Sequence, residues 1–164
     1  MTIALSYAKY RQLLRANQQS DQTFDAISKI PTQVGNGEWQ SIQFASGIEL
    51  VIRKLQTRNR LILKNPPREH PVEFGFWLSG YHQDEYGNHL CAGQNILIGG
   101  LEPGGKVDFF RPQNTINISV YVEAQLLENL VEPLKESNAF SLKEFLQTIH
   151  KEPYFRINCA IRFL

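Results

Sequence analysis

The stretch from Val72 to Leu101, VEFGFWLSGYHQDEYGNHLCAGQNILIGGL, constrains the fold of this chain more than any other part. Its first half is rich in aromatic residues and reads as a strand, and its second half reads as a strand that ends at Gly99 and Gly100. Between them, residues 84–88 (DEYGN) predict a tight turn, because glycine and asparagine tolerate positive φ. A hairpin this apolar is not stable alone in water, so we expect other strands to cover it.

Alternating apolar residues predict further strands on both sides of this hairpin. Residues 48–55 (IELVIRKL) and 115–122 (TINISVYV) alternate with period two, and residues 38–44 do so less regularly. Glycine and proline turns separate these runs, without helical segments for βαβ crossovers. The pattern predicts a mainly β fold with some α, in which residues 31–122 form a cupin-like antiparallel β-barrel or jelly roll.

Helical periodicity lies before and after this β region. Residues 1–30 predict an N-terminal helix, at residues 5–16, followed by a linker. Residues 123–150 predict two amphipathic helices, and residues 151–164 a tail or linker that looks like a chain cut inside a larger pattern. One apolar stripe on the first of these helices suits either covering the barrel or dimerisation, and we assign it to a homodimer contact: Leu126, Leu127, Leu130 and Leu134.

Composition narrows the possible function classes. A chain of 164 residues suits one domain with a real core, and a net charge of +1 without a basic run argues against general nucleic-acid binding. No apolar stretch approaches the roughly 20 residues that span a bilayer, and residues 1–10 do not resemble a secretory signal. Cys91 and Cys159 are too few for a disulfide framework or a zinc site. We therefore expect a cytoplasmic protein with reduced thiols and no membrane contact.

Motifs for catalysis are missing from the sequence. The paired glycines at 99–100 and 104–105 lack the lysine and following helix of a phosphate loop, and no G-x-S-x-G elbow is present. We therefore predict no enzyme and no cofactor. A metal site is the alternative: if the turn is at 84–87, His82 and His89 lie opposite each other and could share a metal with Glu73 or Asp84. The H-x-H pair and following glutamate of metal-binding cupins are not found here.

A ligand cavity is the other chemical possibility. Phe74, Phe76 and Leu78 share one face of the first hairpin strand, and Trp77 and Tyr81 share the other. One set forms core, and the other either packs beneath a helix or lines a cavity, where Arg53, Glu73 and Gln94 could add polar groups. Arg53 either faces solvent or pairs with a ligand carboxylate or phenolate. The candidate ligand-binding residues are Arg53, Phe74, Phe76, Trp77 and Tyr81.

Three phrases of the sequence resemble the N-terminal sensor half of AraC-family transcriptional regulators, in particular the PchR-type subgroup. They are Gly47-Ile48-Glu49-Leu50, Phe74-Gly75-Phe76-x-Leu78-Ser79-Gly80 and Gly93-Gln94-Asn95. PchR-type regulators respond to iron-siderophore complexes in many bacteria. The resemblance covers roughly residues 1–158. It implies a cupin-like barrel that binds an effector, helices that dimerise, and a separate DNA-binding domain with two helix-turn-helix units.

These 164 residues contain no segment that reads as a recognition helix, so the chain departs from that pattern. It would be a truncated regulator or a sensor-only relative, and DNA would be a partner only through a helix-turn-helix domain elsewhere. We therefore expect a regulatory domain that binds a small aromatic or metal-chelate effector and dimerises. The alternatives are a metal-binding cupin protein or enzyme, and an interaction module without an effector.

Overall fold

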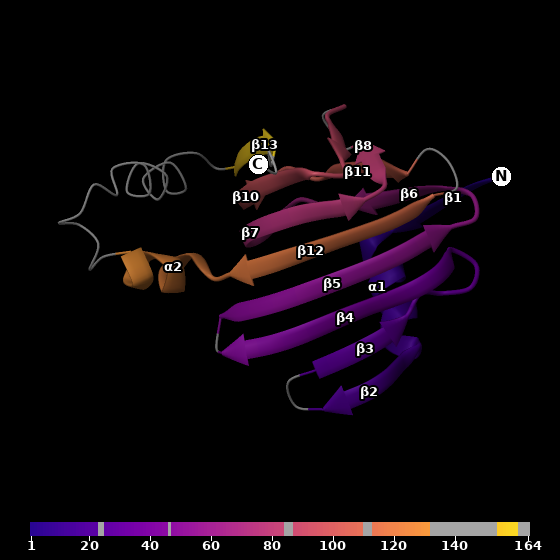
Figure 1. Cartoon of the computed structure of the whole chain (residues 1–164), viewed down its shortest axis with the longest axis horizontal. Helices are drawn as coiled ribbons and strands as arrows, with labels where there is room; N and C mark the ends of the chain where they lie inside the picture. Colours follow the sequence, from indigo (N-terminus) through magenta and orange to yellow (C-terminus); the bar gives the residue numbers. More distant parts are fainter. Residues whose placement is uncertain (23–24, 46, 84–86, 110–112, 132–153, 161–164) are drawn as a thin grey trace.

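Two β-sheets and two helices make up the part of the chain described by the structure, a computed structural model (Figure 1). The described residues are 1–22, 25–45, 47–83, 87–109, 113–131 and 154–160. None of the helices within these ranges is long and apolar enough to cross a membrane. The mainly β fold predicted from the sequence is confirmed.

The smaller sheet has the strand order β1-β6-β11-β8-β9, in which β1 runs parallel to β6 and the other pairs are antiparallel. Its strands are β1 (Thr2–Ser6), β6 (Arg60–Asn65), β8 (Tyr81–Gln83), β9 (His89–Cys91) and β11 (Gly105–Phe109). The larger sheet is antiparallel throughout, with the order β13-β10-β7-β12-β5-β4-β3-β2. Its strands are β2 (Gln18–Gln22), β3 (Asp25–Lys29), β4 (Gly35–Ala45), β5 (Ile48–Thr57), β7 (Arg68–Ser79), β10 (Gln94–Glu102), β12 (Asn114–Val122) and β13 (Tyr154–Ala160).

The sequence predicts a cupin-like β-barrel or jelly roll, and the described residues form a two-sheet sandwich without a closed barrel. Across the described residues neither sheet returns to its own first strand. The sandwich is compatible with a cupin-like or jelly-roll architecture, in which two sheets enclose one core.

The hairpin at Val72–Leu101 links the two sheets. Its root, β7 paired with β10, belongs to the larger sheet, and its outer part, β8 paired with β9, belongs to the smaller one. The chain changes sheet at Gly80, whose φ is +76°. A Cβ atom at Gly80 would lie 2.6 Å from Thr115 Oγ1 and 2.9 Å from Thr115 Cα, so only glycine fits this corner.

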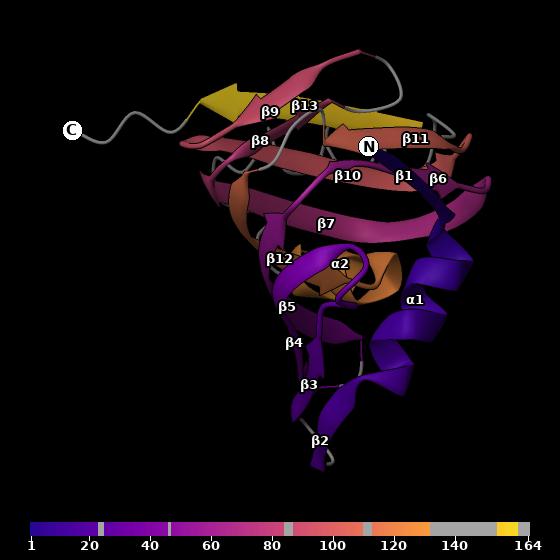
Figure 2. The same cartoon turned by 90° about the vertical axis from the view of Figure 1, so that its right-hand side faces the viewer.

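The leading helix is confirmed as α1 (Tyr7–Ala16), and it lies beside β1, β6 and β3 (Figure 2). It begins where Ser6 Oγ accepts a hydrogen bond from the Lys9 backbone N–H at 3.1 Å, a standard N-cap. After β12 the chain enters α2 (Ala124–Val131), as expected for the first C-terminal helix. The second expected helix, at residues 141–150, lies outside the described residues.

Two expectations about connecting segments are wrong. Most of the expected linker after α1 is strand, because β2 and β3 add to the edge of β4. Residues 154–160 were expected to be a tail or linker. They form β13, every residue of which pairs with a residue of β10. Both segments gain backbone hydrogen bonds from a neighbouring strand, which short sequence patterns do not reveal.

Hydrophobic residues pack on both faces of the larger sheet. One cluster lies between the two sheets and beneath α1, and it contains Tyr10, Leu14, Trp39, Leu61 and Phe109 among others. A second cluster joins α2 to the opposite face, through Leu127 with Val72 and Val122. The face between the sheets also holds the polar residues described next.

Candidate functional site

A cavity of about 110 Å³ lies between the two sheets and beneath α1. A second chamber of about 240 Å³ adjoins it and shares five lining residues with it: Tyr7, Trp39, Arg68, His70 and Tyr121. A cavity of this order admits a single aromatic ring. The inner chamber is lined by side chains from α1 and from nine strands: Tyr7, Tyr10, Trp39, Arg53, Leu55, Leu63, Asn65, Arg68, His70, Glu73, Trp77, His82, Leu90, Ile96, Ile98, Glu102, Val107, Phe109 and Tyr121.

Four residues form one row across the larger sheet. The strand register pairs Trp39 of β4 with Arg53 of β5, Arg53 with Asn117 of β12, and Asn117 with Trp77 of β7. Residues paired across strands point to the same face, so all four side chains point toward the space between the sheets. With strands about 4.8 Å apart, the row spans about 14 Å from Trp39 to Trp77. The row therefore places a guanidinium between two indole rings.

Arg53 stacks its guanidinium on Trp39, with Cζ 4.2 Å from the ring centroid. A guanidinium over the face of an indole ring gains a cation–π attraction. Arg53 Nε is buried without a hydrogen-bond partner, and no carboxylate in the described ranges forms an ion pair with the side chain. The positive charge of Arg53 is therefore not neutralised by a described neighbour.

Helix α1 supplies two tyrosines to the cavity. Tyr7 and Tyr10 are three residues apart and so share one face of the helix. Tyr10 is 1% exposed and packs edge-on against Trp39, with the ring centroids 6.3 Å apart. Burial raises the pKa of Tyr10 to about 12, although the nearby charge of Arg53 acts in the opposite direction. The Tyr10 hydroxyl is thus protonated at neutral pH and able to donate a hydrogen bond.

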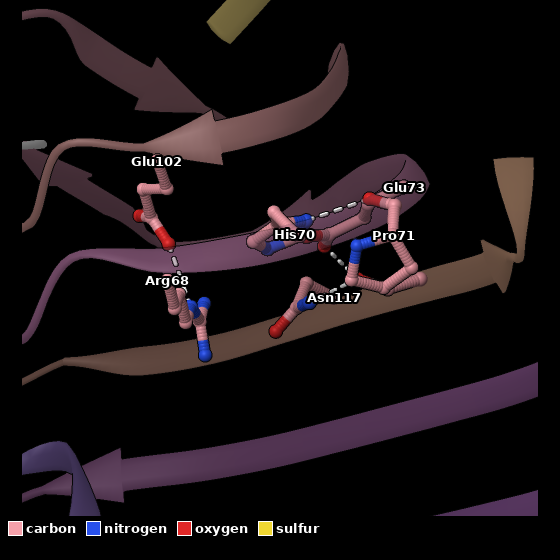
Figure 3. Close-up of polar contacts among 7 residues, drawn as sticks. Arg68, His70, Pro71, Glu73, Glu102 and Asn117 are labelled. Carbon is pink, nitrogen blue, oxygen red and sulfur yellow. Dashed lines mark hydrogen bonds and ion pairs between the residues drawn. The ribbon is translucent and has the colours of Figure 1, made fainter. Parts of the chain in front are cut away.

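A buried polar network forms another part of the wall (Figure 3). Asn117 Nδ2 donates to Ser119 Oγ at 3.2 Å, and Ser119 Oγ donates to Glu73 Oε1 at 2.6 Å. Glu73 Oε2 lies 3.5 Å from His70 Nε2, and His70 Nδ1 donates to the Pro71 carbonyl at 2.7 Å. An irregular register opposite Ile98–Gly100 allows both His70 and Glu73 to face the cavity although they are three residues apart. One oxygen of the Glu73 carboxylate therefore accepts a hydrogen bond from Ser119, and the other lies beside the His70 ring.

Tyr121 lies at the junction of the two chambers. Burial raises the pKa of the Tyr121 hydroxyl well above its usual range, and the neighbouring Glu73 carboxylate adds to the effect. Tyr121 is therefore a neutral phenol at physiological pH.

The second buried carboxylate, Glu102, is paired with Arg68 (Figure 3). Arg68 Nε donates to Glu102 Oε2 at 2.6 Å, and Glu102 is 4% exposed. Arg68 Cζ also lies 4.8 Å from the centroid of the Tyr7 ring. This pair contributes no net charge to the cavity.

Of the predicted ligand residues, the structure brings Arg53 and Trp77 to the cavity. Phe74 packs on the opposite face of the sheet with the cluster beneath α2, and Phe76 shares its parity on β7. The positive φ of Gly80 interrupts the alternation of side chains between the two faces of the strand. His82, rather than Tyr81, is therefore the next residue after Trp77 to line the cavity. Neither Phe74, Phe76 nor Tyr81 is among the described residues that line it.

The expected pairing of His82 with His89 is wrong. In the observed register His82 lies opposite Leu90, and His89 lies opposite Gln83. His82 is buried between Trp77 and Phe109, with ring centroids 4.9 and 5.5 Å away, whereas His89 is exposed. Within the described ranges, no group of three or more His, Cys, Asp or Glu residues could hold a metal ion.

Several lining residues were not predicted from the sequence, above all Trp39, Tyr10, Tyr121 and His70. The signal for Tyr121 was present, since it shares a face of β12 with Asn117 and Ser119. A polar face of an antiparallel strand usually points to solvent. In the structure Asn117 is 1% exposed and Ser119 is 0% exposed.

Comparison with known proteins identifies one family. The model of the regulatory protein PchR N-terminal domain matches residues 35–160. No curated protein matches the chain. A solved structure that resembles it is vicilin from hazelnut (Corylus avellana), with 12% sequence identity and a TM-score of 0.37 over 84% of this chain and 47% of that chain. A similarity at that level does not define the fold.

Proposed function

Because the chain belongs to the family of PchR N-terminal regulatory domains, we propose that it is the effector-sensing domain of an AraC-type transcription regulator. The effector is a small aromatic or metal-chelate, siderophore-like molecule, one aromatic ring of which occupies the cavity between the two sheets. The domain acts in the cytoplasm, and it reaches DNA only through a helix-turn-helix domain present elsewhere. Membership in a family of regulatory domains argues against catalysis.

The row Trp39–Arg53–Asn117–Trp77 is the observation that carries this proposal. It combines two flat apolar surfaces with a half-buried cation that no described carboxylate pairs, which is the composition of a small-molecule site. A core that served only for stability would be filled by apolar side chains. The cavity therefore favours an effector-binding domain over an interaction module without a ligand.

Coupling to regulation follows from the elements that meet at the cavity. Tyr7 and Tyr10 of α1 line it, while α2 packs on the other face of the same strands through Leu127. An effector that binds one arrangement of helices and sheets better than another shifts the population toward that arrangement.

Titration of the intrinsic fluorescence tests the effector proposal. The chain has two tryptophans, Trp39 and Trp77, and both line the cavity. We expect saturable changes with iron(III) chelates of aromatic ligands at micromolar concentration, with calorimetry as an independent measure of affinity. Trp77→Leu should weaken binding about tenfold or more, because a stacking surface is lost.

The matched control is Phe76→Leu, since Phe76 adjoins Trp77 on β7 but belongs to the opposite face. Its affinity should equal that of the wild type. Absence of any binding at micromolar concentration, together with equal behaviour of Trp77→Leu and wild type, would contradict the proposal.

Homodimerisation through the C-terminal helices is a separate part of the proposal. Leu126 and Leu127 already pack against the sheet of their own chain, so a dimer contact would use the remaining surface of α2. The Leu130 side chain and all of Leu134 lie outside the described residues. Light scattering should give twice the 18.8 kDa mass of the chain, and a monomer at the highest concentration would contradict the dimer.

A further inference from the structure

The cavity has a surplus of buried hydrogen-bond donors. Five lining residues carry a buried polar atom without a partner among the described residues: Trp39 Nε1, Arg53 Nε, Trp77 Nε1, Tyr10 OH and Asn65 Oδ1. The three nitrogens can only donate, the phenol can donate or accept, and Asn65 Oδ1 can only accept. Buried polar groups are nearly always satisfied in folded proteins, so this surplus calls for an acceptor-rich occupant.

The two arginines of the cavity wall differ in whether a carboxylate pairs with them. Glu102 is paired with Arg68, and Glu73 accepts a hydrogen bond from Ser119 and lies beside the His70 ring. Arg53 has Trp39 as its stacking partner and no carboxylate in the described ranges. A cation in a buried site is stable when an anion or several hydrogen bonds compensate for its lost hydration.

From this geometry we infer that the effector is a monoanion, and that Arg53, together with Trp39 and Tyr10, binds its carboxylate or phenolate group. The inference rests on the proposed function and specifies the chemistry of that site. The acid lies at Arg53, and the aromatic part of the effector extends along the row to Trp77, two strands or about 10 Å away. A guanidinium with a free N–H edge is suited to an oxygen anion.

The arrangement favours one acidic group over a polyanion. Arg68, the second arginine that lines the inner chamber, is already neutralised by Glu102 at 2.6 Å. A ligand with several phosphates would therefore meet a single available cation there and would also approach the Glu73 carboxylate. One guanidinium compensates for one negative charge.

Three small probes of nearly equal shape and different charge test the inference on the full chain: benzoate, benzamide and benzylamine. Binding is followed by the fluorescence of Trp39 and Trp77 and by calorimetry, in the millimolar range expected for molecules of this size. Benzoate should bind about tenfold or more tightly than benzamide, as expected for a charge-assisted hydrogen bond, and benzylamine should bind most weakly.

The Arg53→Gln variant should lose the preference for benzoate, whereas Arg53→Lys, which keeps the charge, should retain part of it. Arg58→Gln is the matched control, because Arg58 is exposed and bonds to Asn36 Oδ1 at 3.1 Å, away from the cavity. It should bind the probes as the wild type does. If Arg53→Gln does not fold, the comparison of probes on the wild type and on Arg53→Lys decides.

Equal binding of benzoate and benzamide, or an unchanged preference in folded Arg53→Gln, would overturn the anion site and leave the proposed function intact. If aromatic chelates bind and benzoate does not, the anion site is likewise overturned and the proposed function stands. If neither the probes nor the chelates bind, the proposed function fails along with this inference.

Discussion

The Glu102→Gln variant should have a free energy of unfolding about 3 kcal/mol lower than the wild type. Glu102 is 4% exposed and accepts a 2.6 Å hydrogen bond from Arg68, whose side chain is 31% exposed. Burial opposes the charge of Arg68, but the hydrogen bond and charge of Glu102 outweigh this and raise the pKa of Arg68. Without the carboxylate, a largely buried cation loses its counter-charge, which costs about 3–5 kcal/mol in fully buried pairs and less here because Arg68 is partly exposed. Urea unfolding measures the difference.

Two further variants show whether the loss comes from the ion pair. Glu69→Gln removes the charge of an exposed glutamate on the same strand as Arg68, and it should change stability by no more than about 0.5 kcal/mol. Replacing both Arg68 and Glu102 by methionine should restore much of the stability lost in Glu102→Gln, because no buried charge is then left alone. Unfolding of Glu102→Gln at the same urea concentration as Glu69→Gln would refute the assignment.

The strand periodicity of the sequence was sufficient to predict the β class and the parity of individual strands, but not which face is inward. On β12, Ile116, Ile118 and Val120 alternate with Asn117 and Ser119, and the usual rule places the apolar set inside. The structure buries the polar set, and Val120 instead packs on the outer face near α2. The rule failed because the interior contains a polar cavity rather than a dry core.

The same reversal decides the position of Arg53. On β5 the sequence correctly separates Ile48, Leu50 and Ile52 from Glu49 and Arg53, and an outward arginine was one of two open possibilities. Arg53 points inward, because its face of β5 also carries the buried Val51 and Leu55. A polar residue on the same face of a strand as valine or leucine residues therefore indicates a cavity wall.

Contacts between strands distant in sequence account for what remained unpredicted. Trp39 and Trp77 come into one row because β4, β5, β12 and β7 are neighbours in that order, which no local pattern specifies. The displacement of Tyr81 by His82 likewise depends on the backbone at Gly80, where the sequence shows only a glycine within a strand-like run.

The Ser119→Ala variant should also lose about 3 kcal/mol of unfolding free energy, although it removes one oxygen atom. Ser119 is 0% exposed, and its hydroxyl accepts from Asn117 Nδ2 and donates to Glu73 Oε1 at 2.6 Å. Loss of a hydrogen bond to a buried charged group costs about 1.5–3 kcal/mol, and the Asn117 donor left alone adds about 1 kcal/mol. Alanine leaves only a small void, so the hydrogen bonds dominate the difference. Urea unfolding with an unchanged m-value is the expected signature.

The matched control for Ser119→Ala is Ser79→Ala, which makes the same change at an exposed hydroxyl on the neighbouring strand β7. Ser79 Oγ donates to the Asn114 carbonyl at 3.3 Å, a long bond in contact with water, so its loss should cost no more than about 0.5 kcal/mol. If Ser119→Ala is as stable as Ser79→Ala, the hydrogen bond from Ser119 does not compensate the Glu73 carboxylate for the water that it loses on burial. In that case His70, 3.5 Å away, would have to be the partner that holds Glu73 in the cavity wall.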